Sequence, residues 1–499
     1  MKKSSLLISL FIFVLAIYAV LLTVFGNKEW EGSYAIIFNA LHTVNIIATI
    51  IIMLTILSKN DNSQRKVIWL AIMILIPIYG IFIYLIVARD YKTKFIQLDR
   101  PKIKDKTFLL HEPGVDIDLP AHDIFGYAHR LSGRTPYEGD TKTKVLTNGD
   151  MFFPELLKRL SEAKDSIYMA FYIIKRDLIS REIMEILKEK AQKGVKVYLI
   201  YDLVGSKWFR GKLVNELKSA GAHVVPFERL TPLHFFNAIN FRYHRKLTIV
   251  DGKVGFIGGL NIGNEYNHKS RRFGFWRDTH LLVEGRGVIS LTNIFIKDWY
   301  FATGKWLDTT YHYEKVKERG KVVVLESGPD YEEPIIKQVY FKMITDAKKS
   351  IKITTPYLML EPEMLYALQT AAESGISVTI LVPGKPDKFW VNQATKSYYE
   401  VLLQKGVEIY EYTNVFVHSK VLIIDDKIAS VGSVNFDPRS FNINFEATVL
   451  IENASVKDLV HDFAQDLSKS TRIELTEWRK RSLINKIFQG FANLFTPLL

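Results

Sequence analysis

The chain has 499 residues, of which 48% are hydrophobic, and a formal net charge of +13 at pH 7 from 66 Lys and Arg against 53 Asp and Glu. This length exceeds one ordinary domain, and the positive charge favours an anionic partner such as phospholipid or nucleic acid. Because the chain contains no Cys, disulfides, thiol catalysis and Cys-ligated metals are excluded.

Apolar residues are concentrated near the N-terminus. Three runs are each about long enough to cross a bilayer core as a helix, which takes roughly 20 residues: residues 6–25, 35–57 and 67–87. Residues 1–90 are therefore expected to form a retained transmembrane anchor of two or three helices, kinked at Pro77 and Gly80. This predicts a multi-pass protein of the cell membrane. Basic residues flank the runs on both sides, so they do not fix the orientation, although a cytoplasmic catalytic part is preferred.

Two later segments repeat the same order of patterns. Residues 91–142 are basic and rich in Pro, and are interpreted as a connector along the membrane surface. After them, "AKDSIYMAFYII" (163–174) is echoed by "AKKSIKITTPYLM" (347–359), and "KGVKVYLIYD" (193–202) by "SGISVTILVPG" (374–384). Buried strands thus alternate with helices that end at Gly. The pattern predicts two α/β halves, at 143–310 and 320–475, with mostly parallel central strands.

The second half contains the stretch "VHSKVLIIDDKIASVGSVN" (417–435). His418 and Lys420 are two positions apart, so on a strand they share a face, and the apolar residues after them continue into the core. A turn at Asp425 would return the chain as a partner strand. That strand would bring three small or polar residues back toward the His and the Lys: Gly432, Ser433 and Asn435.

The first half repeats this motif as "YHRKLTIVDGKVGFIGGLN" (243–261). The matched positions are held by His244, Lys246, Asp251 and Asn261. A single His and Lys at a strand end is most simply a solvated surface feature. Two copies at equivalent places in a duplicated architecture indicate a functional site instead.

These residue types suit displacement at a phosphodiester phosphorus. Two Lys and two Asn can stabilise charge on the nonbridging oxygens, and a small residue such as Gly259 allows close backbone approach. Two His can divide the remaining work, one neutral as nucleophile and one protonated as acid. No metal is needed for this chemistry and no dense ligand cluster is evident in the sequence, so no cofactor is expected.

The two His-x-Lys-x4-Asp motifs, each followed by a Gly-rich turn and an Asn, resemble those of the phospholipase D superfamily. More narrowly, "WRDTHLLVEG" (276–285), "GSVNFDPRSFNINFE" (432–446) and the C-terminal "LFTPLL" resemble the bacterial cardiolipin synthases, although Tyr243 stands where that family usually has Asn. The resemblance implies two halves packed about a pseudo-twofold around one active site. It also implies transfer of a phosphatidyl group between two phosphatidylglycerol molecules through a phosphohistidine, with release of glycerol.

The same resemblance suggests roles for the motif residues. His244 would be the nucleophile and His418 the general acid and then base, although the exchanged assignment stays open. Asp251 and Asp425 would orient or structure the site rather than transfer protons. Glu265 and Glu446, taken as a matched pair after the two Asn residues, either hydrogen-bond a catalytic His or are strand-surface carboxylates.

Several other features keep two interpretations. "NHKSRRFGFWRD" (267–278) either cradles a phosphoglycerol headgroup or a nucleic-acid strand, or is a solvated loop beside a packed Trp276. His280 is packed or catalytic, and Phe235 and Phe236 enter acyl chains or pack in the core. The amphipathic tail, 476–499, either lies on an anionic membrane or docks against the domain.

Other functions remain open on the same residues. A hydrolytic phospholipase D would use water in place of the acceptor hydroxyl, and a membrane-tethered nuclease would use the same groups on DNA. A non-enzymatic membrane scaffold is disfavoured by two intact motif sets. Phospholipid and membrane are the expected partners, nucleic acid is not expected, and the sequence leaves the oligomeric state open.

Overall fold

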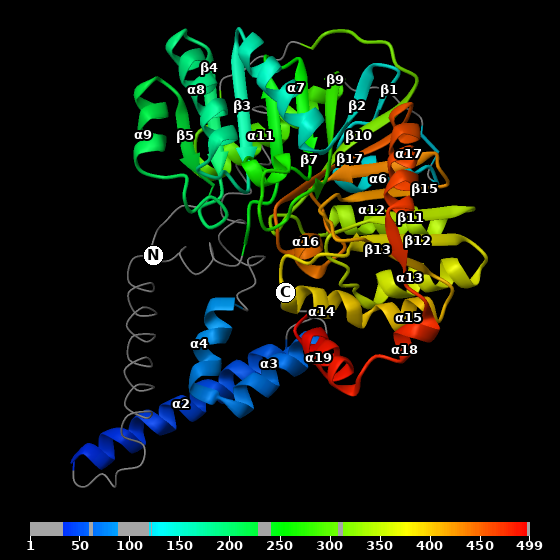
Figure 1. Cartoon of the computed structure of the whole chain (residues 1–499). Helices are drawn as coiled ribbons and strands as arrows, with labels where there is room; N and C mark the ends of the chain where they lie inside the picture. The colour runs from blue at the N-terminus through cyan, green and yellow to red at the C-terminus, as the bar shows by residue number, and fades with distance from the viewer. Residues whose placement is uncertain are drawn as a thin grey trace. The chain divides into compact units, whose positions relative to one another are not determined.

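The computed structural model describes residues 33–58, 63–87, 119–120, 122–227, 241–307 and 313–496. These ranges fall into an N-terminal helical unit and a larger unit that contains both motifs (Figure 1). Four sequence features lie outside the described residues: the first apolar run at 6–25, residues 91–118 of the connector, Phe235 and Phe236.

The N-terminal unit consists of helices α2 (Ser33–Ser58), α3 (Ser63–Leu75) and α4 (Pro77–Val87). Within the described residues, one helical stretch is long and apolar enough to cross a membrane, Asn39–Ser58, with a mean hydropathy of 2.2. This stretch coincides with the second apolar run, so the helix expected there is confirmed. Trp69, Met73 and Ile81 of α3 and α4 are buried together with Ile56 of α2.

The third apolar run is broken sharply at Pro77, where the kink was predicted. The rings of Trp69 and Tyr84 meet edge to face with centroids 5.2 Å apart, whereas a straight helix would separate residues 15 positions apart by about 22 Å. Gly80 permits the bend, because a Cβ there would lie 3.0 Å from the carbonyl oxygen of Ile72. Neither α3 nor α4 alone has the roughly 20 residues that a span requires.

The first half is built on a seven-stranded sheet. Its order is β2 (Thr141–Thr147), β9 (Thr279–Gly285), β7 (Val254–Gly258), β6 (Lys246–Val250), β3 (Ser166–Phe171), β4 (Lys196–Tyr201) and β5 (His223–Pro226). One face is covered by α7 (Asn148–Glu162), α8 (Leu178–Gln192) and α9 (Lys212–Ser219), whose apolar side chains share one core with β3 and β4. A short 3-10 helix, η3 (Asn264–Asn267), follows β7.

The second half is built on a nine-stranded sheet. Its order is β1 (Tyr137–Glu138), β10 (Gly320–Ser327), β17 (Glu446–Asn453), β16 (Ile428–Gly432), β15 (Val421–Ile424), β11 (Ser350–Thr354), β12 (Ser377–Pro383), β13 (Glu408–Tyr412) and β18 (Ser470–Arg472). The helices of this half are α12 (Ile335–Asp346), α13 (Pro362–Glu373), α14 (Phe389–Ser397), α15 (Tyr399–Leu403), α16 (Pro438–Asn442), α18 (Leu475–Arg479) and α19 (Leu483–Leu494).

Both sheets are mixed, so the prediction of mostly parallel central strands is wrong. Only the β3–β4–β5 and β11–β12–β13 ladders are parallel, and the remaining pairs of the two sheets are antiparallel. The reason lies in the motifs themselves. Each motif strand turns tightly at Asp251 or Asp425 and pairs antiparallel with the strand that follows. On its other side each also pairs antiparallel with the first parallel strand of its half, β3 or β11.

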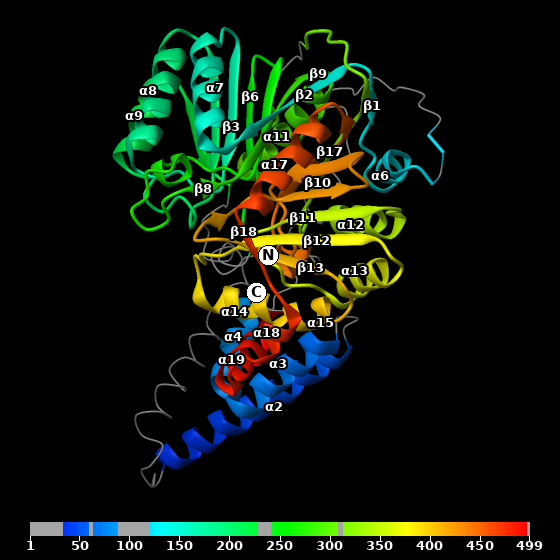
Figure 2. The same cartoon turned by 45° about the vertical axis from the view of Figure 1, so that its right-hand side comes forward.

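Two helices pack against both halves. Helix α11 (Gly287–Thr303) is buried along nearly its whole length and packs against both β6 and β10, while α17 (Ser455–Ser468) packs against both β17 and β2 (Figure 2).

Helix α6 (Ile124–Ser132) and strand β1 fall in the predicted connector, yet α6 packs in the core of the second half and β1 extends its sheet. The described end of that connector is therefore folded.

Candidate active site

The first motif meets the second half at a short parallel bridge. Tyr243 pairs with Phe445, and the backbone N–H of His244 donates to the carbonyl oxygen of Phe445 over 3.0 Å. The next residue after Phe445 is Glu446, which begins β17. The bridge therefore brings His244 beside Glu446.

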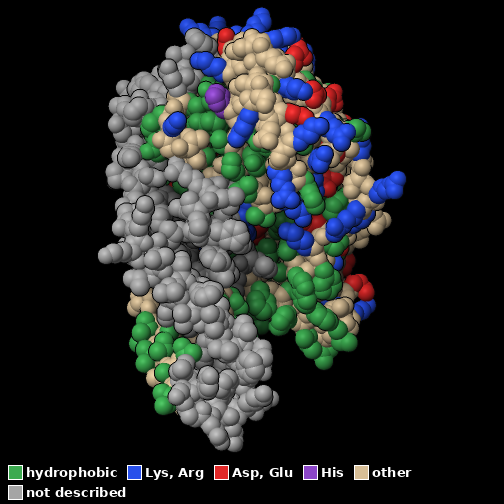
Figure 3. Space-filling view, turned by 90° about the vertical axis from the view of Figure 1, so that its left-hand side faces the viewer, with side chains coloured by type: hydrophobic (Ala, Val, Ile, Leu, Met, Phe, Trp, Pro, Cys, Tyr) green, Lys and Arg blue, Asp and Glu red, His purple; other side chains and the backbone are tan. Residues whose placement is uncertain are grey.

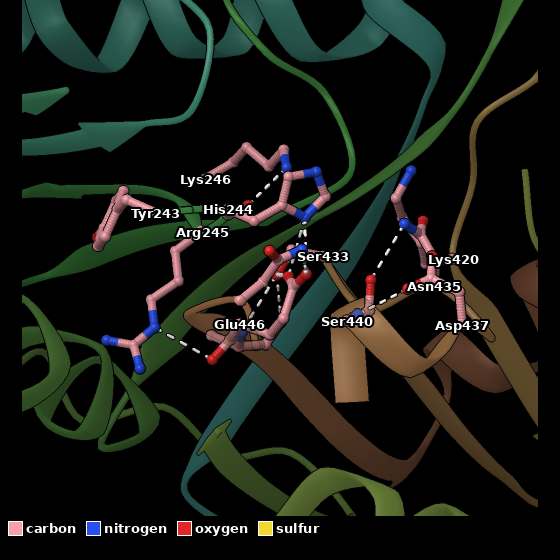
Figure 4. A network of polar contacts seen from close by, with 12 residues as sticks. Tyr243, His244, Arg245, Lys246, Lys420, Ser433, Asn435, Asp437, Ser440 and Glu446 are labelled. Atoms are coloured by element: carbon pink, nitrogen blue, oxygen red, sulfur yellow. Dashed lines mark hydrogen bonds and ion pairs between the residues drawn. The ribbon is translucent and has the colours of Figure 1, made fainter. Parts of the chain in front are cut away.

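His244 and Glu446 form a close pair (Figure 4). The imidazole Nδ1 lies 2.8 Å from Glu446 Oε1, and because a carboxylate can only accept, Nδ1–H is the donor. Ser433 donates its hydroxyl to the other Glu446 oxygen. The carboxylate thus fixes the tautomer of His244, which leaves the Nε2 lone pair available for attack.

The second motif repeats this arrangement with the halves exchanged. Strand β14 (Phe416–Val417) pairs in parallel with β8 (Trp276–Arg277), and the N–H of His418 donates to the carbonyl oxygen of Arg277 over 2.7 Å. His418 Nδ1 lies 2.7 Å from Asp278 Oδ2. Asp278 also accepts from the backbone N–H of Thr279 at 2.8 Å. Each histidine is therefore oriented by a carboxylate from the other half.

The two motif lysines are buried beside the histidines. Lys246 Nζ donates to the carbonyl oxygen of His244 at 2.5 Å, and Lys420 makes the same bond to His418. Burial lowers the pKa of Lys246 to about 7 and that of Lys420 to about 8, although Glu446 and Asp278 favour the charged forms. A bound anion beside these ammonium groups would raise the pKa of both and favour their charged forms.

Burial also keeps both imidazoles neutral. It lowers the pKa of His244 to about 4, opposed by Glu446, and that of His418 to about 3, reinforced by Lys420 and opposed by Asp278. Lys420 also acts on His244, and Lys246 also acts on His418. The two motifs therefore lie within one electrostatic field, which supports a single site.

The full chain is similar to known proteins over almost its whole length. It is 37% identical to a cardiolipin synthase of Geobacillus sp. (strain WCH70) over 98% of both chains, and 38% identical to that of Geobacillus kaustophilus over 95% of this chain and 96% of the relative. The family model "Cardiolipin synthase, PLD-like domain" matches residues 156–276 and 340–469, and a phospholipase D-nuclease N-terminal model matches 44–89. The chain belongs to the bacterial cardiolipin synthases of the phospholipase D superfamily.

A solved structure agrees with the fold of this cardiolipin synthase family member. The phosphatidylserine synthase of Haemophilus influenzae superposes with a TM-score of 0.56 at 15% identity, over 76% of this chain and all of that one. At this identity the likeness concerns the fold alone.

Of the two carboxylates considered as partners of a motif histidine, Glu446 makes that contact and Glu265 does not. Glu265 lies 3.4 Å from Lys175, on a partly exposed ion pair, and Asp278 stands in the position expected for it. Glu265 follows its motif Asn by four residues, whereas Glu446 follows its own by eleven, so the two were not equivalent. The usable signal was position in the fold, because Asp278 directly precedes β9 as Glu446 begins β17.

The motif aspartates lie away from the histidines. Asp251 caps the backbone N–H groups of Lys164, Asp165 and Ser166, and Asp425 caps the matching residues 348–350. Both have positive φ, 53° and 55°, as turn residues with short polar side chains tolerate. Each is seven positions along the chain from its His, about 23 Å when extended. They hold the turns and do not reach the site.

The predicted substrate-binding residues have local partners. Asn261 Oδ1 accepts from the N–H of Ile173 at 3.1 Å, and Asn435 Nδ2 donates to Ser440 at 3.1 Å. Asn435 Oδ1 is buried without a hydrogen-bond partner among the described residues. Gly259 faces Asp278, since a Cβ there would lie 2.0 Å from Asp278 Oδ1. Glycine at 259 thus makes room for the carboxylate that holds His418.

Beneath the first motif lies a buried ionic network that sequence reasoning missed. Arg245 pairs with Asp298 and, at 3.2 Å, with Glu326, and its Nε donates to the carbonyl oxygen of Glu446 over 3.1 Å. Tyr243, the departure from the family pattern, donates its hydroxyl to Asp298 at 2.8 Å. The network ties the backbone on both sides of the His244–Glu446 pair to α11 and β10. Arg245 sits between the motif His and Lys, which was the available signal.

The cationic and aromatic stretch 267–278 is partly buried and partly exposed. Trp276 and Arg277 are buried, and Arg277 pairs with Asp466 at 2.7 Å, while Arg271 and Arg272 are exposed. His280 is fully buried and lies against Phe152, with ring centroids 4.2 Å apart. The packed interpretation of His280 therefore holds. Across the described ranges, no group of three or more His, Asp or Glu is arranged to hold a metal ion.

Proposed function

We propose that this cardiolipin synthase joins two phosphatidylglycerol molecules to give cardiolipin and glycerol through a phosphohistidine. The observation that carries the proposal is the pair of buried imidazoles, each hydrogen-bonded to a carboxylate of the other half and each beside a buried Lys. One such set could bind an anion. Two such His and Lys pairs, close enough to act on each other's pKa, supply both a nucleophile and an acid.

In the first step, His244 Nε2 attacks the phosphorus of the first phosphatidylglycerol. Lys246 and Lys420 stabilise the charge on the nonbridging oxygens. The arriving phosphodiester raises the pKa of both histidines, and Asp278 stabilises the imidazolium of His418. His418 donates its proton to the departing oxygen as the P–O bond breaks, and glycerol leaves.

In the second step, neutral His418 accepts the proton from a headgroup hydroxyl of a second phosphatidylglycerol. The hydroxyl oxygen attacks phosphorus, the P–N bond to His244 breaks, and cardiolipin forms. Glu446 holds His244 in place through both steps and balances the positive charge of the phosphorylated imidazole.

The test is a product assay with the full-length protein in phosphatidylglycerol vesicles and excess EDTA. We expect cardiolipin and glycerol in equal amounts, and loss of both by at least about 100-fold in His244→Ala and His418→Ala. Phosphatidic acid without cardiolipin would instead indicate hydrolysis. DNA cleavage by a protein inert toward lipid would indicate the nuclease.

We also infer that the two halves, roughly residues 143–310 and 320–475, are related by an approximate twofold, which the matched bridges Tyr243–Phe445 and β14–β8 support. The anchor is proposed to cross the bilayer more than once, with the catalytic unit on the cytoplasmic side. The apolar character of 6–25 and of α2 supports two crossings. Because the chain has no Cys, single introduced thiols and an impermeant reagent can establish the topology.

A further inference from the structure

Helix α19 has its apolar side facing outward, whereas a helix that covers a protein core has its apolar side facing inward. Its inward positions are polar or small: Gln489 is 5% exposed and accepts from Arg481 at 3.0 Å, and Ala492 is buried. Its outward positions are apolar, with Ile487 at 61% exposed. A helix in contact with water on that side would carry charged residues there instead.

The apolar side of α19 continues onto α14, against which it packs. Trp390 lies 6.0 Å from Phe488 and 6.1 Å from Phe491 between ring centroids. We call the following exposed side chains the aromatic surface: Phe389, Trp390, Leu483, Ile487, Phe488 and Phe491. Figure 3 shows apolar side chains gathered at the lower right of the catalytic unit, below a band of Lys and Arg.

A short chain of contacts connects the aromatic surface with the active site. Asp387, just before α14, accepts from the hydroxyl of Tyr357 at 2.6 Å and, through its carbonyl oxygen, from Arg272 at 2.6 Å. Arg272 belongs to the loop that leads into Trp276, whose ring centroid is 5.2 Å from that of His418. These contacts link the segment before α14 to the loop that packs on His418.

We propose that the catalytic unit docks on an anionic phospholipid bilayer through the aromatic surface, which inserts at the level of the headgroups and upper acyl chains. Exposed cations border the surface, namely Arg271, Arg272, Lys388 and Lys486, and they complement anionic headgroups. Tryptophan favours that interface, and exposed apolar residues this numerous on one face mark a contact site. This proposal rests on the proposed function in one respect: a phospholipid substrate would enter the site from the docked bilayer.

The test uses the absence of Cys. In the full-length protein, Ile487→Cys is labelled with an environment-sensitive fluorophore, and Glu185→Cys, at an exposed position on α8, is the matched control. The proteins are reconstituted in vesicles of phosphatidylglycerol and phosphatidylcholine. Quenching is then compared between doxyl-labelled lipid and aqueous iodide.

Strong quenching by doxyl lipid at position 487, with iodide quenching only at position 185, is the expected result. Quenching of both positions by iodide alone would overturn the proposal, since the surface would then face water. Protection of position 487 from both quenchers would also overturn it, because protein would then cover the surface, either the anchor of the same chain or a second copy.

Activity provides a second readout. Ile487→Glu combined with Phe491→Glu should lower turnover of vesicle substrate by about tenfold or more, because charged side chains oppose insertion, while turnover of detergent-dispersed substrate stays unchanged. Equal loss in both would overturn the docking role. If the unsubstituted protein makes no cardiolipin but position 487 is still quenched by doxyl lipid, the proposed function fails and the docking surface stands.

Discussion

Asp278 is the side chain on which the orientation of His418 depends. Because its carboxylate fixes the tautomer and stabilises the imidazolium, Asp278→Asn should lower turnover by about 100-fold with little change in the protein's thermal stability. Glu265→Gln is the matched control, since Glu265 pairs with Lys175 instead, and should retain nearly full turnover. Cardiolipin formation in vesicles measures both, and the reverse order of effects would contradict the assignment.

Asp251 and Asp425 should matter for stability rather than for chemistry. Each accepts three backbone N–H groups, so replacement by Asn, which tolerates positive φ but lacks the charge, should lower the free energy of unfolding by about 1–2 kcal/mol. Thermal unfolding in detergent measures this, with Asp426→Asn as the control at a positive φ of 55°. A loss of turnover with unchanged stability would show that these carboxylates act in the reaction.

His280 should make stability fall in acid. Burial lowers its pKa to about 3, mainly by desolvation, whereas the pKa of a His in the unfolded chain is about 6.5. Below about pH 6.5 the unfolded chain therefore binds a proton that the folded chain does not. The free energy of unfolding should fall by up to about 1.4 kcal/mol per pH unit from there toward about pH 3, and above about pH 6.5 His280 causes no such loss.

The comparison with His280→Asn isolates this effect, because Asn Oδ1 can keep the bond that His280 Nδ1 accepts from Leu260 N–H. The stability difference between the two proteins should shrink as the pH falls. A difference independent of pH between 7 and 4 would mean that His280 is not held neutral.

At the scale of elements, the motif strands were predictable and their cross-half contacts were not. Period-2 patterning and the tight turns indicated β6–β7 and β15–β16, because strand faces and turn residues are local properties. The bridges that bring Asp278 to His418 join residues 140 positions apart, and no local pattern specifies such a pairing. The mostly parallel order was predicted from the strand and helix alternation before each motif, and the motif hairpins, which were themselves predicted, add antiparallel strands to both sheets.

Gly259 and Ser433 hold equivalent places in the two motif hairpins. Gly259→Ala would put a Cβ 2.0 Å from Asp278 Oδ1, so it should displace that carboxylate and lower turnover by about tenfold or more. Ser433→Ala removes the hydrogen bond to Glu446 and the one that its hydroxyl accepts from the Ala447 N–H, but introduces no clash, so it should lower turnover less than Gly259→Ala does. Turnover in vesicles checks both, and an equal effect of the two alanines would contradict the steric argument.

At the scale of the whole molecule, neither half alone holds every residue that the proposed mechanism uses. Each supplies one His, one Lys and the carboxylate that orients the other half's His. The proposed mechanism needs both motifs, because each imidazole has its own environment and the two take different roles.

The most direct test of this account is to trap the covalent intermediate in His418→Ala. A phosphatidyl ester of p-nitrophenol needs no proton on its leaving group, so the first step should proceed while the second lacks its base. Base quench, digestion and mass spectrometry should find a phosphorylated His244, and the His244→Ala protein should carry no adduct. An adduct on His418 in His244→Ala, or release of p-nitrophenol without any adduct, would contradict the account.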